Sequence, residues 1–171
     1  MQMRRADRAI TDPDHIDIIL ARADVGHLGL TDAEGVYVVP LSFAHATSGD
    51  GRVTVYVHGA QAGRKVAAIT EAPGARICFE AEIRHATFGA DDLQACHIGV
   101  AYESVIGWGT ARVVTDPGEA RSALSMIVEK YAPGRGGDVP EALEFVAVLA
   151  FDLDTMTGKR RTAPTGPVST A

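Results

Sequence analysis

Several features that would point to a function at once are scarce in these 171 residues. The two cysteines, Cys78 and Cys96, are too few for a disulfide framework, and neither belongs to a C-x-x-C pair of the kind that holds a metal. No apolar run approaches the roughly 18 residues that a membrane span needs, and the opening MQMRRADRAI leads into polar residues instead of an apolar signal core. These absences favour a cytoplasmic protein with no membrane partner.

Positive charge is scarce as well. The chain has 16 Lys and Arg against 22 Asp and Glu, a formal net charge of -6. A nucleic-acid or anionic-membrane surface needs a basic stripe, so we expect neither partner. The 46% hydrophobic content supplies one core but not two, and no internal repeat is present. We therefore expect one domain over residues 1–161 and a flexible tail over residues 162–171, which are rich in Pro, Thr and Ser.

The most informative stretch is VTVYVHGAQAGRKVAAI, which runs from residue 53 to residue 69. Valine alternates with Thr, Tyr and His up to His58, as in a half-buried strand, and a helix is expected to open at Gly63-Arg64-Lys65. Two cations in the first turn of a helix oppose its macrodipole, by about 0.3 to 1 kcal/mol each, unless an anion binds there. Arg64 and Lys65 thus indicate either a phosphate site or two solvated surface residues without a ligand.

Hydrophobic periodicity predicts five further strands and two further helices around this stretch. Each helix follows an Asp-Pro pair, Asp12-Pro13 or Asp116-Pro117, which places an N-cap residue before a first-turn proline. Residues 85–99 are aperiodic and are expected to form a covering loop. The further strands are expected at residues 25–31, 36–45, 76–82, 100–113 and 144–153.

Two of these strands contain residues that are unusual in a sheet. Pro40 cannot donate to a ladder, so it must lie at an edge, at a bulge, or where the backbone faces a ligand. Gly107 and Gly109 alternate within one strand, which indicates strong curl or the close approach of another backbone. Because the strands follow one another without alternating helices, the sequence predicts a mainly β (α+β) fold, a six-stranded Greek-key barrel with flanking helices.

At this point the residues resemble a known family. The order of elements, together with VYVVPLSFAH, VYVHGAQAGRK and YESVIGWGTAR, resembles the FMN-binding split barrels of the pyridoxamine 5′-phosphate oxidase-like superfamily. Within it the chain is similar to the nitroimidazole-resistance branch, whose motifs are V-P-[IL]-S, H-[SG]-A-x-x-G-x-K and Y-x-S-V-x-x-x-G. The resemblance runs from about residue 4 to residue 161 and implies a split barrel.

The resemblance implies roles in binding FMN for residues of the central stretch. Gly63, Arg64 and Lys65 match the part of the family loop that grips the FMN phosphate, in agreement with the helix-terminus interpretation above. His58 and Gly59 match the start of that loop, beside the ribityl chain or the flavin edge.

It also implies roles for two strands. Val39, Pro40, Leu41 and Ser42 match the stretch whose backbone passes the isoalloxazine ring, and Ser104 matches a polar position on the strand beneath the flavin. The family places the flavin between two barrels, so we expect a homodimer with the strand around Gly107 near the contact.

Departures from the family's sequence patterns limit which of the family's activities we expect of this chain. The oxidase that makes pyridoxal phosphate has a basic motif on its second strand and a basic, aromatic C-terminal segment, whereas this chain has VVPLSF and ends in GKRRTAPTGPVSTA. Pyridoxamine phosphate oxidation is therefore not expected. The resemblance implies an FMN-dependent oxidoreductase that reduces a small organic acceptor, such as a nitroaromatic or a quinone, with electrons from a reduced nicotinamide. The alternative is a non-catalytic protein that binds flavin or haem.

Other side chains have both a functional and a structural interpretation. His58 either places substrate or a proton near the flavin, as the one candidate catalytic residue, or binds a backbone carbonyl at the turn. His85, Cys96 and His97 lack metal-ligand spacing, so no metal site is expected. Tyr102 and Trp108 are expected to be core or interface aromatics, with coverage of the flavin as the alternative.

Overall fold

The computed structural model describes residues 4–89, 98–140 and 145–164. Its α-helices are α1 (Pro13–Arg22), α2 (Arg64–Glu71) and α3 (Pro117–Tyr131), with 3-10 turns η1 (Ala6–Arg8) and η3 (Gly136–Asp138). The strands are β1 (Ala9–Ile10), β2 (Gly26–Asp32), β3 (Gly35–Leu41), β4 (Phe43–Thr47), β5 (Val53–Gly59), β6 (Arg76–Phe88), β7 (Gly99–Val113) and β8 (Ala147–Arg161).

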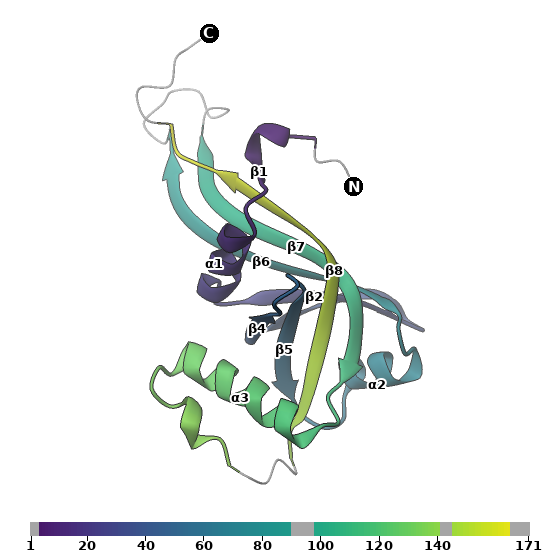
Figure 1. Ribbon diagram of the computed structural model, residues 1–171. Coiled ribbons are helices and arrows are strands. Elements are labelled where there is room, and N and C mark those ends of the chain that lie inside the picture. Colours follow the sequence, from purple (N-terminus) through teal and green to yellow (C-terminus); the bar gives the residue numbers. More distant parts are fainter. Residues whose placement is uncertain (1–3, 90–97, 141–144, 165–171) are drawn as a thin grey trace.

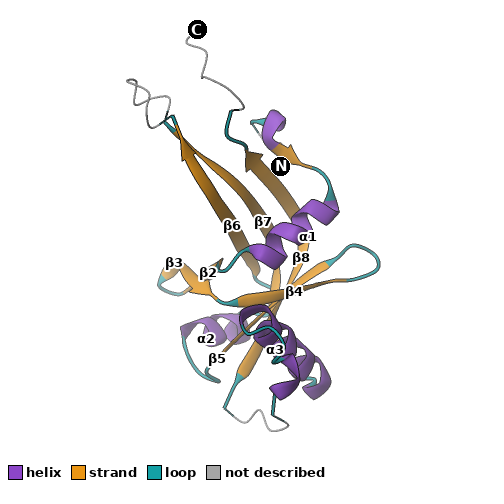
Figure 2. Cartoon of the chain, turned by 90° about the vertical axis from the view of Figure 1, so that its left-hand side faces the viewer, coloured by secondary structure: helices purple, strands orange, loops and turns teal. Residues whose placement is uncertain are grey.

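The strands form one antiparallel sheet in the order β3-β2-β6-β7-β8-β5-β4, and β1 pairs with β8. Within the described residues the edge strands β3 and β4 do not pair with each other, so the sheet is not closed. Figure 1 shows β6, β7 and β8 running side by side along the length of the molecule. In Figure 2, α1 lies along these strands, and α2 and α3 lie at the end away from the C-terminus. This arrangement confirms the α+β class and is consistent with a split barrel.

The expected number of six strands is wrong, because the described sheet has eight. The two-residue strand β1 was not predicted, and the run at residues 36–45 divides at Ser42 into β3 and β4. The division has a local cause: the Phe43 N–H donates to the Tyr131 hydroxyl (3.0 Å), and the Phe43 ring is fully buried. The chain therefore stops pairing with β2 after Leu41 and begins to pair with β5 at Phe43.

Two strands are longer than the sequence predicts. β8 continues past residue 153 to Arg161, through a register shift between Trp108 and Gly109 of β7. β6 continues to Phe88, through a shift between Arg84 and Thr87, so part of the expected loop at 85–99 is strand. Such irregularities interrupt the period-two pattern on which the sequence prediction depends. Of the loop and the expected tail, residues 90–97 and 165–171 lie outside the described ranges.

The main core lies where β2, β4, β6 and β8 face one another. Phe43 and Phe79 meet edge-to-face with ring centroids 5.1 Å apart, and Phe151 lies 6.4 Å from Phe79. All three rings are fully buried. The glycine at position 109 permits close packing of backbones, because a Cβ there would lie 1.9 Å from the carbonyl oxygen of Asp152. The close approach predicted from the alternating glycines is thereby confirmed at this position.

Glu103 of β7 connects α1 to the long strands. Its Oε1 lies 2.5 Å from Nε2 of His15 on α1, and its Oε2 lies 3.0 Å from Nε2 of His85 on β6. Burial raises the pKa of the Glu103 carboxyl, but the hydrogen bonds with the two imidazoles outweigh burial and the pKa is lowered overall. Folding therefore favours the ionised carboxylate.

This lowered pKa predicts a pH dependence of stability. A carboxylate of this kind stabilises the fold above its unfolded pKa of about 4.3, and the stabilisation is lost as the pH falls through the folded value. We expect the free energy of unfolding of the parent to fall more steeply between about pH 5 and pH 3 than that of Glu103→Gln. Urea unfolding at each pH measures the free energy of unfolding of the two proteins. If the two free energies depend on pH in the same way, Glu103 makes no contribution to the pH dependence of stability.

Candidate functional site

The C-terminal end of β5 and the start of α2 form the centre of the candidate site. Gly63 is the N-cap of α2, with φ of +144°, and no side chain caps the helix. The first helical bond runs from the Ala67 N–H to the Gly63 carbonyl (2.9 Å). The N–H groups of the first turn precede that bond and point out of the helix end, where an anion can accept hydrogen bonds from them.

Lys65 provides a cation at this helix end. Its side chain is half-buried and lies against Gly59, where an added Cβ would be 2.7 Å from Nζ. None of the described residues gives the Lys65 ammonium a hydrogen bond or an ion pair. Lys65 is therefore available to a ligand.

Arg64 has a different environment from Lys65. Its Nε lies 2.6 Å from Oδ2 of Asp32 and its Nη2 lies 3.3 Å from Glu34, while the guanidinium stacks over the Tyr37 ring at 4.1 Å. The hydrogen bond from Arg64 lowers the pKa of Asp32. Arg64 thus links α2 to the turn between β2 and β3 through these ion pairs. The carboxylates of Asp32 and Glu34 offset the charge of its guanidinium. Its predicted contact with a phosphate stays a prediction.

The stretch from Val39 to Ser42 lies at the edge of the sheet. Pro40 is on the edge strand β3 opposite His27 of β2, so the edge position, one of the three alternatives predicted for it, is confirmed. Val39 and Leu41 are half-buried on the inner side, whereas Pro40 and Ser42 are exposed. The outer side of this edge is thus open to a ligand or to another chain.

Ser104 is not brought to Lys65 within one chain. It lies on β7 between Glu82 of β6 and Lys159 of β8, whereas α2 packs near Ala111 of the same strand. The seven residue steps from 104 to 111 span roughly 23 Å of strand. A ligand that contacts both Lys65 and Ser104 would therefore have to span this length of strand or take the two residues from different chains.

Lys159 is a candidate site residue that sequence reasoning missed. It lies directly opposite Ser104, is half-buried, and has no hydrogen bond or ion pair among the described residues. Its only signal in the sequence was the GKRR run, which was assigned to the region after the last strand. The irregular register of β8 hid its place in the sheet.

Among the described residues, no helix covers one face of the sheet over β3, β2, β6 and β7, which we call the uncovered face. Cross-strand pairing places Val38, Gly29, Cys78 and Trp108 in one row of this face. Helix α1 contacts Glu103, on the opposite face, and α3 covers β4, β5 and β8. The exposed fractions of Val38 (61%) and of its neighbour Val36 (80%) are high for apolar side chains. This surface is apolar enough to form an interface between proteins.

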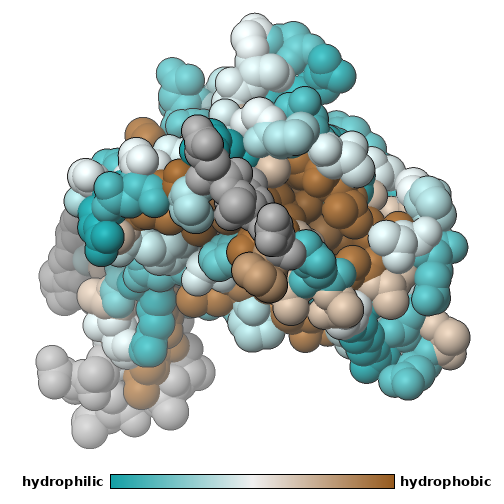
Figure 3. All heavy atoms as spheres, turned by 90° about the horizontal axis from the view of Figure 1, so that it is seen from below, coloured by the Kyte–Doolittle hydropathy of each residue, from teal (hydrophilic) through white to brown (hydrophobic). Residues whose placement is uncertain are grey.

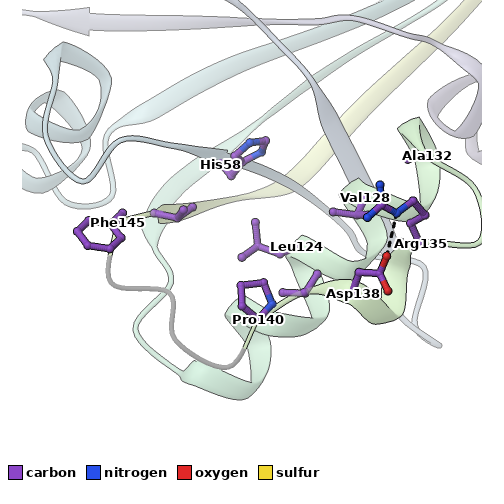
Figure 4. Close-up of a pocket in the computed structure, with 10 residues that line it drawn as sticks. His58, Leu124, Val128, Ala132, Arg135, Asp138, Pro140 and Phe145 are labelled. Atoms are coloured by element: carbon purple, nitrogen blue, oxygen red, sulfur yellow. Dashed lines mark hydrogen bonds and ion pairs between the residues drawn. The ribbon is translucent and has the colours of Figure 1, made fainter.

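His58 points away from the Lys65 side of β5 and opens into a cavity of about 520 Å³ (Figure 4). Leu124 and Val128 of α3 form one wall, and Pro140 and Phe145 lie across from His58. Seen from the end at which α3 lies, apolar side chains gather in a hollow of the surface (Figure 3). The structure therefore gives His58 an apolar pocket of ligand size.

The expectations about a metal site and about a membrane-spanning segment can be compared only with the described residues. Cys96 and His97 lie outside them, so the expectation about those two side chains is not tested. In the described ranges, no group of three His, Cys, Asp or Glu side chains is arranged to hold a metal ion. No helix there has the length and apolar character to cross a membrane.

The fold and the chain match a known class of proteins. The family model described as pyridoxamine 5′-phosphate oxidase matches residues 12–160. The chain therefore belongs to this family, as the sequence motifs indicated. No curated protein matches the chain.

Solved structures show the same fold. A candidate 5-nitroimidazole antibiotic resistance protein from Bacteroides thetaiotaomicron is 28% identical with a TM-score of 0.72, over 89% of this chain and 86% of that one. The flavocytochrome Anf3 from Azotobacter vinelandii has 23% identity and a TM-score of 0.77, over 95% and 73%. The FAD and heme binding protein from Mycobacterium smegmatis has 17% identity and a TM-score of 0.76, over 91% and 74%.

Proposed function

We propose that the protein is a homodimeric FMN-dependent oxidoreductase that reduces a small, neutral organic acceptor, with a reduced nicotinamide as the source of electrons. The observation that carries the proposal is Lys65, a half-buried cation without a partner among the described residues, beside the uncapped N-terminus of α2. Membership of the pyridoxamine 5′-phosphate oxidase family and the flavin-binding names of similar structures support it.

The residues at this helix end fit a terminal phosphate. Lys65 would supply a charge-assisted contact and the first-turn N–H groups would supply hydrogen bonds. Because Gly59 lacks a Cβ, the Lys65 ammonium has room to lie against the end of β5. Val39, Pro40, Leu41 and Ser42 would present backbone and apolar surface to the ring. Bound FMN would supply the redox chemistry, and the chain would bind it, orient it and restrict access.

The separation of Lys65 and Ser104 along the fold supports a dimer. A second copy seated on the uncovered face of β3, β2, β6 and β7 would bring its own Ser104 and Lys159 towards the flavin bound by the first. We expect sedimentation to report a dimer at micromolar protein. A monomer that still holds FMN tightly would contradict this part of the proposal.

The acceptor would bind near few fixed charges, so molecules with several charges would lose hydration without compensation. His58 is proposed to place a proton or the acceptor, tuning the rate without being essential. The test is anaerobic stopped-flow reoxidation of the reduced flavin by a nitroimidazole, for the parent and for His58→Ala. A loss between a few-fold and about a hundredfold is expected, at or below the usual contribution of a general acid. An unchanged rate would leave His58 without this role.

The same measurement separates catalysis from mere binding. Reduced flavin that stays bound and unreacted with nitroaromatics and quinones would contradict the reductase and favour a non-catalytic flavin protein. An absorption spectrum of the purified protein distinguishes a flavin from a haem before any acceptor is added.

A further inference from the structure

The cavity next to His58 has the features of a ligand site in its own right. Its volume of about 520 Å³ is within the range of about 300–1,000 Å³ that is typical of small-molecule sites. We propose that it binds a neutral, largely apolar molecule with one or two aromatic rings, held by one hydrogen bond to the His58 imidazole.

The walls select apolar ligands. Leu124 and Val128 of α3 lie on one side, and Pro140 and Phe145 lie on the other (Figure 4), while Val139 is a further apolar residue of the lining. Phe145 is 85% exposed, which is unusual for a large apolar side chain. A flat aromatic ligand would remove this surface from water and could stack on the Phe145 ring.

The charges at the cavity exclude ions. Among the described residues of the lining, two are charged, Arg135 and Asp138, and they pair with each other, Nε to Oδ2, at 2.8 Å. Both are well exposed, with side chains 70% and 60% accessible. No unpaired charge therefore remains in the described lining, and a charged ligand would lose hydration without compensation.

Among the described side chains of the lining, His58 is the polar one that has no hydrogen bond or ion pair. Thr54, Tyr56 and His58 alternate along the same face of β5, and the first two donate hydrogen bonds to Asp152 and Glu119, each at 2.9 Å. His58 receives none from the described residues. Since a neutral imidazole carries both a donor and an acceptor, it can bind a hydroxyl, a carbonyl or a nitro group.

We call Lys65 and the N-terminus of α2, the proposed site of the FMN phosphate, the phosphate clamp. The cavity and the phosphate clamp lie at one end of β5 but on opposite sides of it. Binding of an aromatic molecule here does not depend on the flavin, whereas its identity as the electron acceptor rests on the proposed function. The two proposals can therefore fail separately.

The test is a calorimetric titration of the full-length protein with 2-naphthol at pH 7, compared with 2-naphthoate, which adds a negative charge to the same rings. We expect 2-naphthol to bind at least tenfold more tightly. Val128→Phe, which fills the cavity, should abolish binding, whereas the same change at Val25, which is exposed and lies outside both the cavity and the uncovered face, should not. His58→Leu should weaken binding about tenfold through the lost hydrogen bond.

Three results would overturn the inference: no binding of 2-naphthol, equal binding of 2-naphthoate, or binding that survives Val128→Phe. An unchanged affinity in His58→Leu would remove His58 from the site. Titration of the same preparations with FMN reports on the phosphate clamp independently, because Lys65 lies on the other side of β5.

Discussion

Replacing Lys65 by alanine is expected to weaken FMN binding about 5- to 150-fold, which corresponds to about 1–3 kcal/mol. The physical reason is the loss of a charge-assisted hydrogen bond from an ammonium group that has no partner among the described residues. Fluorescence titration of the flavin measures the effect. Gly59→Ala should weaken FMN binding in the same direction but by less, because its Cβ would lie 2.7 Å from Nζ and shift an ammonium that keeps its charge at the end of a flexible side chain.

Two controls make this prediction specific to the phosphate. Arg52→Ala removes the same charge from an exposed turn, where Arg52 pairs with Asp50, and should leave FMN affinity unchanged. Riboflavin, which lacks the phosphate, should bind Lys65→Ala and the parent equally. An FMN affinity that is the same in Lys65→Ala as in the parent would remove Lys65 from the clamp.

Replacing Phe79 by alanine is expected to lower the free energy of unfolding by about 3–5 kcal/mol. Phe79 is fully buried between Phe43 and Phe151, so its removal leaves a cavity that the surrounding sheet fills only in part. Because domains of this kind are typically stable by only about 5–15 kcal/mol, the variant should be marginally folded.

Urea unfolding of the parent and the variant, at one fixed protein concentration, measures this difference. Ile18→Ala serves as the control, because Ile18 is 50% exposed on α1 and should cost much less. A loss of under about 1 kcal/mol for Phe79→Ala would show that the packing of β2, β4 and β8 around this ring is not as described.

Local patterns were sufficient to predict most of the elements. Asp12 and Asp116 both cap their helices, accepting from the backbone N–H groups of Asp14 and Glu119. Register and strand division were not predictable, because they depend on distant partners. Phe43 leaves its run to meet Tyr131, which is 88 residues away in sequence.

The candidate site was predictable to the extent that it is local. Gly63, Arg64 and Lys65 are adjacent in the chain, so their position at a helix end follows from the helix itself. The pairing of Arg64 with Asp32, and the placement of Lys159 opposite Ser104, depend on how strands meet and carry no local signal. The cavity at His58 likewise depends on the packing of α3 against β5.

The central claim is that the N-terminus of α2 with Lys65 binds the phosphate of FMN. Its most direct test is equilibrium titration of the parent protein with FMN and with riboflavin under the same conditions. We predict that FMN binds at least tenfold more tightly, since the phosphate alone contacts the clamp. Equal affinities for the two flavins would contradict the account.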